Sequence, residues 1–271
     1  MIGINTNAAS LIAQKNLNNN AAGLTNNITR LSSGLRVNSA RDDAAGLAIA
    51  TRMSADTRGM EVAKRNANDG ISALQVADGT ISSITDNLQR MRELAVQSAT
   101  GTLTASDRTN LDAEYQSLSA EITDQAAKAN FNGVNLLDGS VASLDIQTGS
   151  KNGDVVSISL TDAATAVTAS AAGNLTTAAN ANTALTNIDA AMDTLNSGRA
   201  TLGAGMNRLD AVVSNLTTTV TNLSAARGRI MDADFAAETA SLTRSQILQQ
   251  AGTAMLAQAN QLPNNVLSLL K

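Results

Sequence analysis

The sequence contains no cysteine, no histidine and no tryptophan, and it has a single proline among 271 residues. Without cysteine the chain has no disulfide framework and no thiolate chemistry. With neither cysteine nor histidine, it offers no obvious place for a catalytic or metal site. We therefore expect no cofactor and no enzymatic activity.

Aromatic residues are almost as scarce, because Tyr115, Phe131 and Phe235 are the whole set. The chain is nevertheless 43% hydrophobic, mostly through alanine, leucine, isoleucine and valine. A compact globule of this size usually anchors its core on large rings. This composition favours long helices that meet along narrow apolar seams.

Charge and hydropathy exclude further classes of protein. The net charge of −4 and the isoelectric point near 4.8 argue against a nucleic-acid binder, which would carry a basic patch. No apolar run approaches the length that spans a bilayer, and the first residues lack the pattern of a secretory signal. We expect a soluble protein with no membrane insertion that does not use the general secretory route.

Apolar residues recur with heptad spacing along most of the chain, which is typical of coiled-coil packing. The clearest seam runs Met53, Met60, Ala67, Leu74, Ile81, Leu88, Ala95, and a shorter one runs Leu111, Tyr115, Leu118, Ile122. Another extends from Leu185 to Leu223, about 57 Å at 1.5 Å per residue. The sequence predicts a mainly α fold built of long, coiled-coil-like helical rods.

A different pattern interrupts the helices in the middle of the chain. Residues 141–160 alternate apolar and polar side chains on both sides of Asn152-Gly153, which predicts one small β-hairpin. A second Asn-Gly pair, in "NFNGVNLLDG" (130–139), predicts a tight turn. Residues 161–183 are alanine, threonine, serine and asparagine without a period, as in a low-complexity connector.

Two narrow seams occupy the ends of the chain. Their members, which we take as a polymerisation seam, are Leu24, Ile28, Leu31, Leu248, Met255, Leu262 and Val266. Each end would be only marginally stable as an isolated helix. The two ends either pair as a helical hairpin within one chain or fold when many copies surround them.

The stretch "LSSGLRVNSARDDAAGLAIA" (31–50) concentrates charge beside a helix break. Gly34 suits a helix C-terminus that needs a left-handed residue. Adjacent carboxylates such as Asp42 and Asp43 serve in principle as an acid–base pair, but they more often cap the following helix. We therefore expect a joint, in which Arg36, Arg41, Asp42 and Asp43 combine capping with ion pairing between subunits.

Two weaker motifs have structural explanations. Gly203 and Gly205 lack the third glycine and the strand–turn–helix setting of a dinucleotide loop, so we expect them to thin a helix where it crosses a neighbour. Asp232 and Asp234 lack the glycine and distal glutamate of a calcium loop and are expected in a loop and helix cap.

A second face of the helix around residue 90 predicts a contact surface. If Leu88, Met91 and Ala95 define the seam, then Arg90, Leu94 and Gln97 fall together about a third of a turn away. With their neighbours, the candidate contact residues are Gln89, Arg90, Glu93, Leu94 and Gln97. An apolar Leu94 among polar groups suggests a lateral interface between subunits.

Five motifs together resemble bacterial flagellin. They are "LSSGLRVNSARDDAAGLAIA", "LQRMRELAVQSATGT" (88–102), "NFNGVNLLDG", "DADFAAETASLTRSQIL" (232–248) and "QANQLPNNVLSLL" (258–270). The resemblance covers about 1–160 and 184–271 and leaves only the connector. It implies a short form without a large variable surface domain.

The resemblance implies a division into domains with paired terminal helices. Residues 1–33 and 237–271 would form an inner-tube coiled-coil domain, and 47–230 would form an outer-tube helical domain. Residues 34–46 and 231–236 would link the two.

The same resemblance implies a function and partners. The chain would polymerise with itself into the extracellular flagellar filament for swimming, after export through the flagellar type III system. It would also meet an export chaperone, the filament cap and hook–filament junction proteins. The alternatives are a junction protein of the same superfamily and a secreted flagellin-like binding protein.

The resemblance also gives the second face a role in host recognition. In many flagellins this surface, completed by a glutamate on the next helix, docks the vertebrate Toll-like receptor for flagellin. Glu114 occupies the matching acidic position here. Because one face cannot meet a neighbouring subunit and a receptor together, the two roles should compete.

Overall fold

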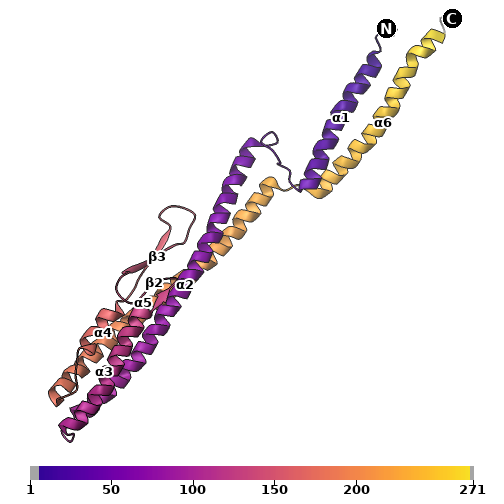
Figure 1. The fold of residues 1–271 in the computed structure, drawn as a ribbon. Coiled ribbons are helices and arrows are strands. Elements are labelled where there is room, and N and C mark those ends of the chain that lie inside the picture. Colours follow the sequence, from indigo (N-terminus) through magenta and orange to yellow (C-terminus); the bar gives the residue numbers. More distant parts are fainter. Residues whose placement is uncertain (1–5, 269–271) are drawn as a thin grey trace. The chain divides into compact units, whose positions relative to one another are not determined.

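The computed structural model describes the backbone of residues 6–268 and the side chains of residues 6–261. The described chain is mainly helical, as the sequence predicts (Figure 1). Its elements are, in order, α1 (Ala8–Ser33), α2 (Ala44–Ala99), α3 (Ala105–Lys128), β1 (Asn130–Phe131), β2 (Val134–Asn135), β3 (Ser143–Gln147), β4 (Val155–Ser159), α4 (Ala163–Ala171), α5 (Ala178–Met231) and α6 (Phe235–Ser268).

The chain divides into two compact units, which are described separately below. The first, the terminal unit, joins Met1–Ala55 with Thr221–Lys271, and the second, the central unit, is Asp56–Val220.

In the terminal unit, α1 and α6 lie side by side, which confirms that the terminal helices pair within one chain (Figure 1). Polar side chains set the register of this antiparallel pair. The amide Nδ2 of Asn7 donates to the carbonyl of Ala259 at 2.8 Å, and that of Asn20 donates to the carbonyl of Ser245 at 2.7 Å. Asparagine thus orients a seam that buries little apolar surface.

The central unit is organised by the heptad seam of α2. Its members from Ala67 to Ala95 are 0% exposed, and so are the companion residues Ala77, Ile84 and Met91. On α5, Ile188, Leu195, Leu202 and Leu209 repeat every seventh residue and are equally buried. The coiled-coil pattern predicted from sequence is confirmed, because both long helices bury the same small and branched side chains along their length.

Local signals begin and end the helices where the sequence indicates. Thr104 caps α3 in a capping box, in which its hydroxyl accepts from the amide of Asp107 and the Asp107 carboxylate accepts from the amide of Thr104. Gly34 ends α1 at a φ of +71°, and its amide donates to the carbonyl of Arg30 at 2.8 Å. Both residues act as caps, as expected from their types.

The structure contains two antiparallel strand pairs among its described residues, not the one hairpin predicted. The additional pair is β1–β2, in which Phe131 lies opposite Val134 across Asn132 and Gly133. Both turn residues have positive φ, +50° and +81°, as a two-residue hairpin turn requires. The sequence shows the turn but not its strands, because two residues on each side are too few to reveal alternation.

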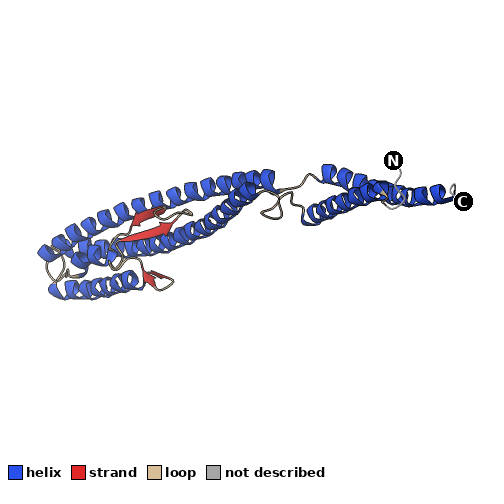
Figure 2. Ribbon diagram, turned by 90° about the horizontal axis from the view of Figure 1, so that it is seen from above, coloured by secondary structure: helices blue, strands red, loops and turns tan. Residues whose placement is uncertain are grey.

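The predicted hairpin is confirmed as β3–β4, with Leu144 opposite Ile158 and Ile146 opposite Val156. Its strands lie beside the long helices (Figure 2), and glycines on these helices make room for it. A Cβ at Gly70 on α2 would overlap the side chain of Ile146, and one at Gly205 on α5 would lie 2.9 Å from Cγ2 of Ile158. A two-stranded hairpin is marginal alone, and these contacts hold it on the helices.

The prediction of a connector without secondary structure at 161–183 is wrong, because this segment contains α4 and the start of α5. The Asp162 carboxylate caps α4 by accepting from the amide of Thr165 at 2.8 Å. Ala163, Val167 and Ser170, at helical spacing, are buried. The helical spacing of these buried residues is not visible in the sequence, because Val167 is the only large apolar side chain in α4.

Two glycine variants test the docking of the hairpin. Gly205→Ala should lower the free energy of unfolding by about 1–3 kcal/mol, because the new methyl group overpacks against Ile158. Gly203→Ala is the matched control on the same helix, since nothing lies within 4 Å of its added Cβ. The control should raise stability by up to about 1 kcal/mol through helix propensity. Chemical denaturation measures both, and equal shifts in the two variants would refute this account.

Candidate functional site

The two linkers meet at one joint in the terminal unit. The amide of Arg36 donates to the carbonyl of Met231 at 2.6 Å, and the amide of Ala233 donates to the carbonyl of Gly34 at 2.9 Å. Because these bonds join backbone atoms, the segment that follows α1 is fastened to the segment that precedes α6. The charged motif is therefore a structural joint within the subunit.

The two adjacent aspartates of the joint have separate structural roles. Oδ2 of Asp42 accepts from the amides of Asn38 and Ser39 and from the Ser39 hydroxyl, at 2.9–3.1 Å. These hydrogen bonds, with the Ser39 amide contributing most, hold the pKa of Asp42 below its usual value. Asp43 caps α2, since its Oδ1 accepts from the amide of Gly46 at 2.8 Å. Both carboxylates accept hydrogen bonds from backbone amides, which disfavours the acid–base alternative.

The arginines of the joint differ in their partners. Nη2 of Arg36 donates to the carbonyl of Ile230 at 2.7 Å, so this side chain braces the joint. Arg41 and Arg30 make no ion pair among the described residues. Both line a polar hollow of about 430 Å³ whose other walls are Asn26, Thr29, Asn38, Ser39 and Asp42. We call it the linker hollow; it presents positive charge to solvent.

The predicted polymerisation seam is largely uncovered in the subunit. Ile28, Leu248 and Met255 are 52%, 53% and 65% exposed, whereas Leu24 and Leu31 are half-buried. The side chains of Leu262 and Val266 lie outside the described residues.

A groove of about 640 Å³ runs between α1 and α6 within this surface. We call it the terminal groove, and it is lined by Ala9, Ile12, Ala13, Asn16, Leu17, Asn20, Leu248, Ala251, Gly252 and Met255. The seam thus offers apolar surface that the chain itself does not bury.

The polar residues of the candidate contact face of α2 are exposed in the subunit, whereas its apolar centre is not. Nε and Nη2 of Arg90 donate to Oε1 of Glu114 on α3, at 3.0 and 2.8 Å, and Nη1 donates to Glu93 at 2.9 Å. These bonds raise the pKa of Arg90, with Glu114 contributing most. Gln89 and Gln97 are exposed on the same helix.

Leu94, expected as the apolar centre of this face, is only 2% exposed and belongs to the core. One turn later, Ser98 is also buried, and its hydroxyl donates to the carbonyl of Leu175 in the loop before α5 at 2.7 Å. α2 therefore buries a wider stripe than a single seam, because the α4–α5 loop covers a flank that helical spacing alone assigns to solvent. The expectation of an exposed Leu94 was wrong.

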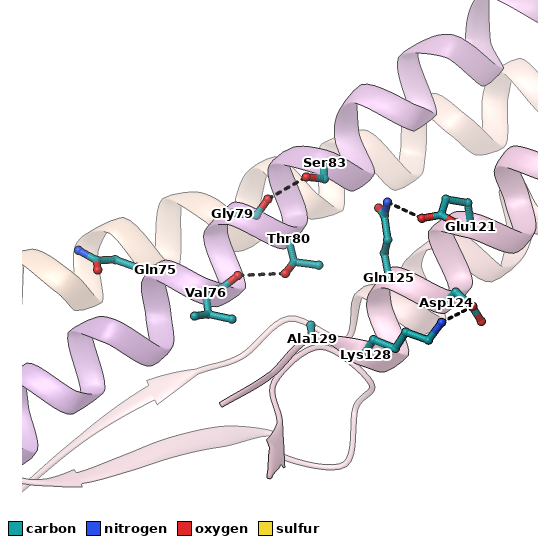
Figure 3. Close-up of a pocket in the computed structure, with 10 residues that line it drawn as sticks. All are labelled: Gln75, Val76, Gly79, Thr80, Ser83, Glu121, Asp124, Gln125, Lys128 and Ala129. Carbon is teal, nitrogen blue, oxygen red and sulfur yellow. Dashed lines mark hydrogen bonds and ion pairs between the residues drawn. The ribbon is translucent and has the colours of Figure 1, made fainter. Parts of the chain in front are cut away.

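A polar hollow of about 450 Å³ separates α2 from α3 (Figure 3). We call it the α2–α3 hollow. Its charged residues are paired locally: Lys128 donates to Asp124 at 2.6 Å, and Gln125 donates to Glu121 at 2.9 Å. Thr80 and Ser83 likewise donate to carbonyls one turn back on α2. Each hydroxyl and charged group labelled in Figure 3 therefore has a hydrogen-bond partner within the chain, and none of them is arranged as a nucleophile or a general base.

The other motifs also prove structural. Among the described residues, no three side chains of the metal-binding types gather, and no helix is long and apolar enough to cross a membrane. Asp234 caps α6 by accepting from the amides of Ala236 and Ala237. Gly205 lies where α5 contacts the hairpin, as expected of a glycine at a crossing point. Gly203 does not, because nothing lies within 4 Å of a Cβ added there.

Sequence reasoning missed the residues of α2 and α3 that hold the α4–α5 segment in place. Tyr115 Oη donates to the carbonyl of Ser170 at 2.6 Å, and burial raises the pKa of this phenol to about 12. Asp112 accepts from the amide of Leu175 at 2.7 Å. The available signal was Tyr115 itself, because a lone tyrosine in an apolar seam usually directs its hydroxyl to a partner.

Comparisons with known proteins agree on one family. The family described as "Bacterial flagellin N-terminal helical region" matches residues 4–142, and "Bacterial flagellin C-terminal helical region" matches residues 185–270. The chain is 41% identical to a flagellin of Xenorhabdus nematophila and 43% identical to one of Halalkalibacterium halodurans, covering 99% of each chain in both cases. Among solved structures, the crystal structure of Bacillus cereus flagellin aligns with a TM-score of 0.52 and 38% identity, over 60% of this chain and 94% of that one.

A variant pair tests the capping role of Asp43. Asp43→Ala should destabilise the subunit by about 1 kcal/mol, because the amide of Gly46 loses its acceptor at the start of α2. Asp43→Asn keeps a side-chain oxygen and should lose much less. Thermal unfolding compares them, and an asparagine variant as unstable as the alanine variant would show that charge, rather than capping, matters at this position.

Proposed function

Because this chain belongs to the bacterial flagellin family, we propose that α1 and α6 bury their exposed apolar side chains between copies as the flagellar filament assembles. Flagellins are structural proteins that polymerise into the extracellular flagellar filament, and this chain is such a filament subunit. The relatives that match it from end to end are flagellins, which favours this role over that of a junction protein.

The observation that carries the proposal is the exposure of large apolar residues on the terminal helices. Leu11, Ile12, Ile28, Ile247, Leu248 and Met255 are each more than half exposed. A single exposed leucine is ordinary, but an apolar groove flanked by such residues marks an interaction site. Covering them with a second copy gains roughly 25 cal/mol per Å² of apolar surface removed from water.

The distribution of buried and exposed apolar residues also supports a division of the chain into an inner-tube and an outer-tube region. We propose that residues 1–33 and 237–271, including Leu262 and Val266, line the inner tube of the filament, and that 47–230 form the outer tube. The buried core supports this assignment, because its members lie between Ala67 and Leu209 and leave the terminal helices with polar and exposed apolar faces.

In this proposal, the joint between these regions forms ion pairs with neighbouring copies. Arg41 and Arg30, which make no ion pair within the described chain, would meet carboxylates of a neighbouring subunit at the linker hollow. Arg36, Asp42 and Asp43 serve inside the subunit and are not assigned to such pairs.

Further partners follow from family membership. We propose that the chain leaves the cell through the flagellar type III channel and that its C-terminal segment binds an export chaperone beforehand. The filament cap and the hook–filament junction proteins would contact it at the two ends of the polymer. A catalytic role is not proposed, since the family is structural.

The polar face of α2 supports a proposal of receptor recognition. Arg90 and Glu114, with Gln89, Glu93 and Gln97, form the exposed polar surface that would contact the Toll-like receptor for flagellin. The same face would meet a neighbouring subunit in the filament, so receptor binding would be confined to the monomer.

A charge placed on the exposed seam tests the assembly proposal. Leu248→Asp should abolish filaments, because a carboxylate buried between copies costs several kcal/mol unless it is paired. The subunit itself should stay folded, since Leu248 is 53% exposed. Gln250→Asp introduces the same charge at an exposed polar position of α6 and serves as the control. Circular dichroism checks the fold and electron microscopy checks assembly; normal filaments from Leu248→Asp would contradict the proposal.

An arginine pair on α2 tests the receptor proposal. Arg90→Ala should sharply reduce receptor signalling by monomer, because alanine cannot replace a forked guanidinium contact. Arg92→Ala is the control, since Arg92 also forms one exposed ion pair, to Asp189 at 2.8 Å on α5. A cell reporter assay compares the monomers, and equal responses to the two variants would remove the receptor role while leaving filament assembly intact.

A further inference from the structure

One aromatic side chain of this protein is left outside the folded subunit. Tyr115 is fully buried and Phe131 packs against the core, but Phe235, the first residue of α6, is 57% exposed. Large rings supply much of the affinity where proteins meet, because each buries a wide apolar area. An exposed phenylalanine in a subunit that polymerises therefore needs a place to bind.

Acidic residues flank Phe235 in the sequence. Asp232 and Asp234 precede Phe235, and Glu238 lies three residues later on the same face of α6. Oδ1 of Asp234 accepts from two helix amides, which leaves its other oxygen free to accept elsewhere. We call residues 232–238 the acidic aromatic segment; its partner must combine an apolar floor with positive charge.

A cleft in the central unit has that combination. It lies beside the β3–β4 turn, has a volume of about 570 Å³, and is floored by Met60 on α2 and by Val156, Val212 and Leu216 on the hairpin and α5. Lys151 and Arg208 stand among its lining residues. We call it the hairpin cleft.

The two cations of the hairpin cleft form no ion pair with any residue that the structure describes. The ion pairs there join Arg90 to Glu93 and Glu114, Arg92 to Asp189, Lys128 to Asp124, and Arg199 to Asp78, so neither Lys151 nor Arg208 takes part in one. The cleft also contains Asp154, but its Oδ2 accepts from the backbone amide of Lys151 at 3.1 Å and so stabilises the turn. The net charge that the cleft offers a ligand is positive.

We propose that the acidic aromatic segment of one copy docks in the hairpin cleft of another copy, with the Phe235 ring on the apolar floor and Asp232 or Asp234 against Arg208 and Lys151. This contact rests on the proposed function, since assembly brings the copies together. It names one specific pair of surfaces within the polymer.

The other three hollows described above fit the segment less well. The terminal groove has no charged lining residue, and the linker hollow has no apolar one. The α2–α3 hollow carries Glu121 and Asp124 against the single cation Lys128, so it would repel the carboxylates. Charge and hydropathy together select the hairpin cleft.

Because the natural chain has no cysteine, single introduced thiols report this contact cleanly. Thr239→Cys places a thiol one turn after Phe235, and Thr219→Cys places one on the wall of the cleft. Filaments assembled from a mixture of the two variants and then oxidised should yield a disulfide between different copies, since a disulfide needs Cα atoms within about 7 Å. Mass spectrometry of proteolysed filaments identifies the joined peptides.

The matched control replaces Thr219→Cys by Thr80→Cys. Thr80 lines the α2–α3 hollow, and both threonines donate to the carbonyl four residues earlier. The control mixture should give little of the disulfide. Filaments in which both mixtures cross-link equally, or in which neither does, overturn the proposed contact.

A charge exchange provides a second test that does not depend on cross-linking. Arg208→Glu should slow filament elongation, and adding Asp232→Arg in the same chain should restore much of the rate by reversing the pair. A double variant no faster than Arg208→Glu alone overturns the contact. Wild-type protein that forms no filaments overturns the proposed function and this inference with it. If the wild type forms filaments, but the cysteine mixture gives no disulfide and the double charge variant shows no rescue, this inference alone is overturned.

Discussion

The continuous apolar stripe of α2 is the constraint on which the central unit depends. From Ala67 to Ala95 it presents small and branched side chains with no ring among them, so its partners approach closely and over a long distance. Gly70 interrupts the stripe where Ile146 of the hairpin enters, and Gly205 on α5 does the same for Ile158. A core made this way is narrow, and its stability comes from length rather than from a compact cluster of large side chains.

The polar groups are divided between two tasks. In the middle of the central unit, cations meet carboxylates within the chain, as Arg199 does with Asp78 and Arg92 with Asp189. In the joint, by contrast, carboxylates accept from backbone amides, and Arg41 forms no ion pair within the described part of the chain. Exposed ion pairs contribute little to folding, typically 1 kcal/mol or less each. These ion pairs help to fix how neighbouring helices align along their length. Cations left unpaired remain available to other copies.

The terminal helices pair with each other and still leave apolar surface uncovered. Asn7 and Asn20 of α1 donate from their side-chain amides to backbone carbonyls of α6. That polar pairing orients the helices without covering Leu248 and Met255, which remain more than half exposed. In the proposed assembly, the free energy of burying those side chains is released on polymerisation, not on folding.

Sequence alone determined the helical architecture, because apolar periodicity repeats every few residues along a helix. It also determined the cap at Gly34, whose left-handed backbone is a local property, and it indicated the family through five motifs. It also placed the β3–β4 hairpin, whose alternation is long enough to see.

Only the tertiary structure decided which faces are covered. Leu94 belongs to the core, and one turn later Ser98 donates to Leu175 in a loop far along the chain. Tyr115 of α3 likewise donates to the carbonyl of Ser170 near the end of α4. Such contacts join residues distant in sequence, and no local pattern encodes their partners.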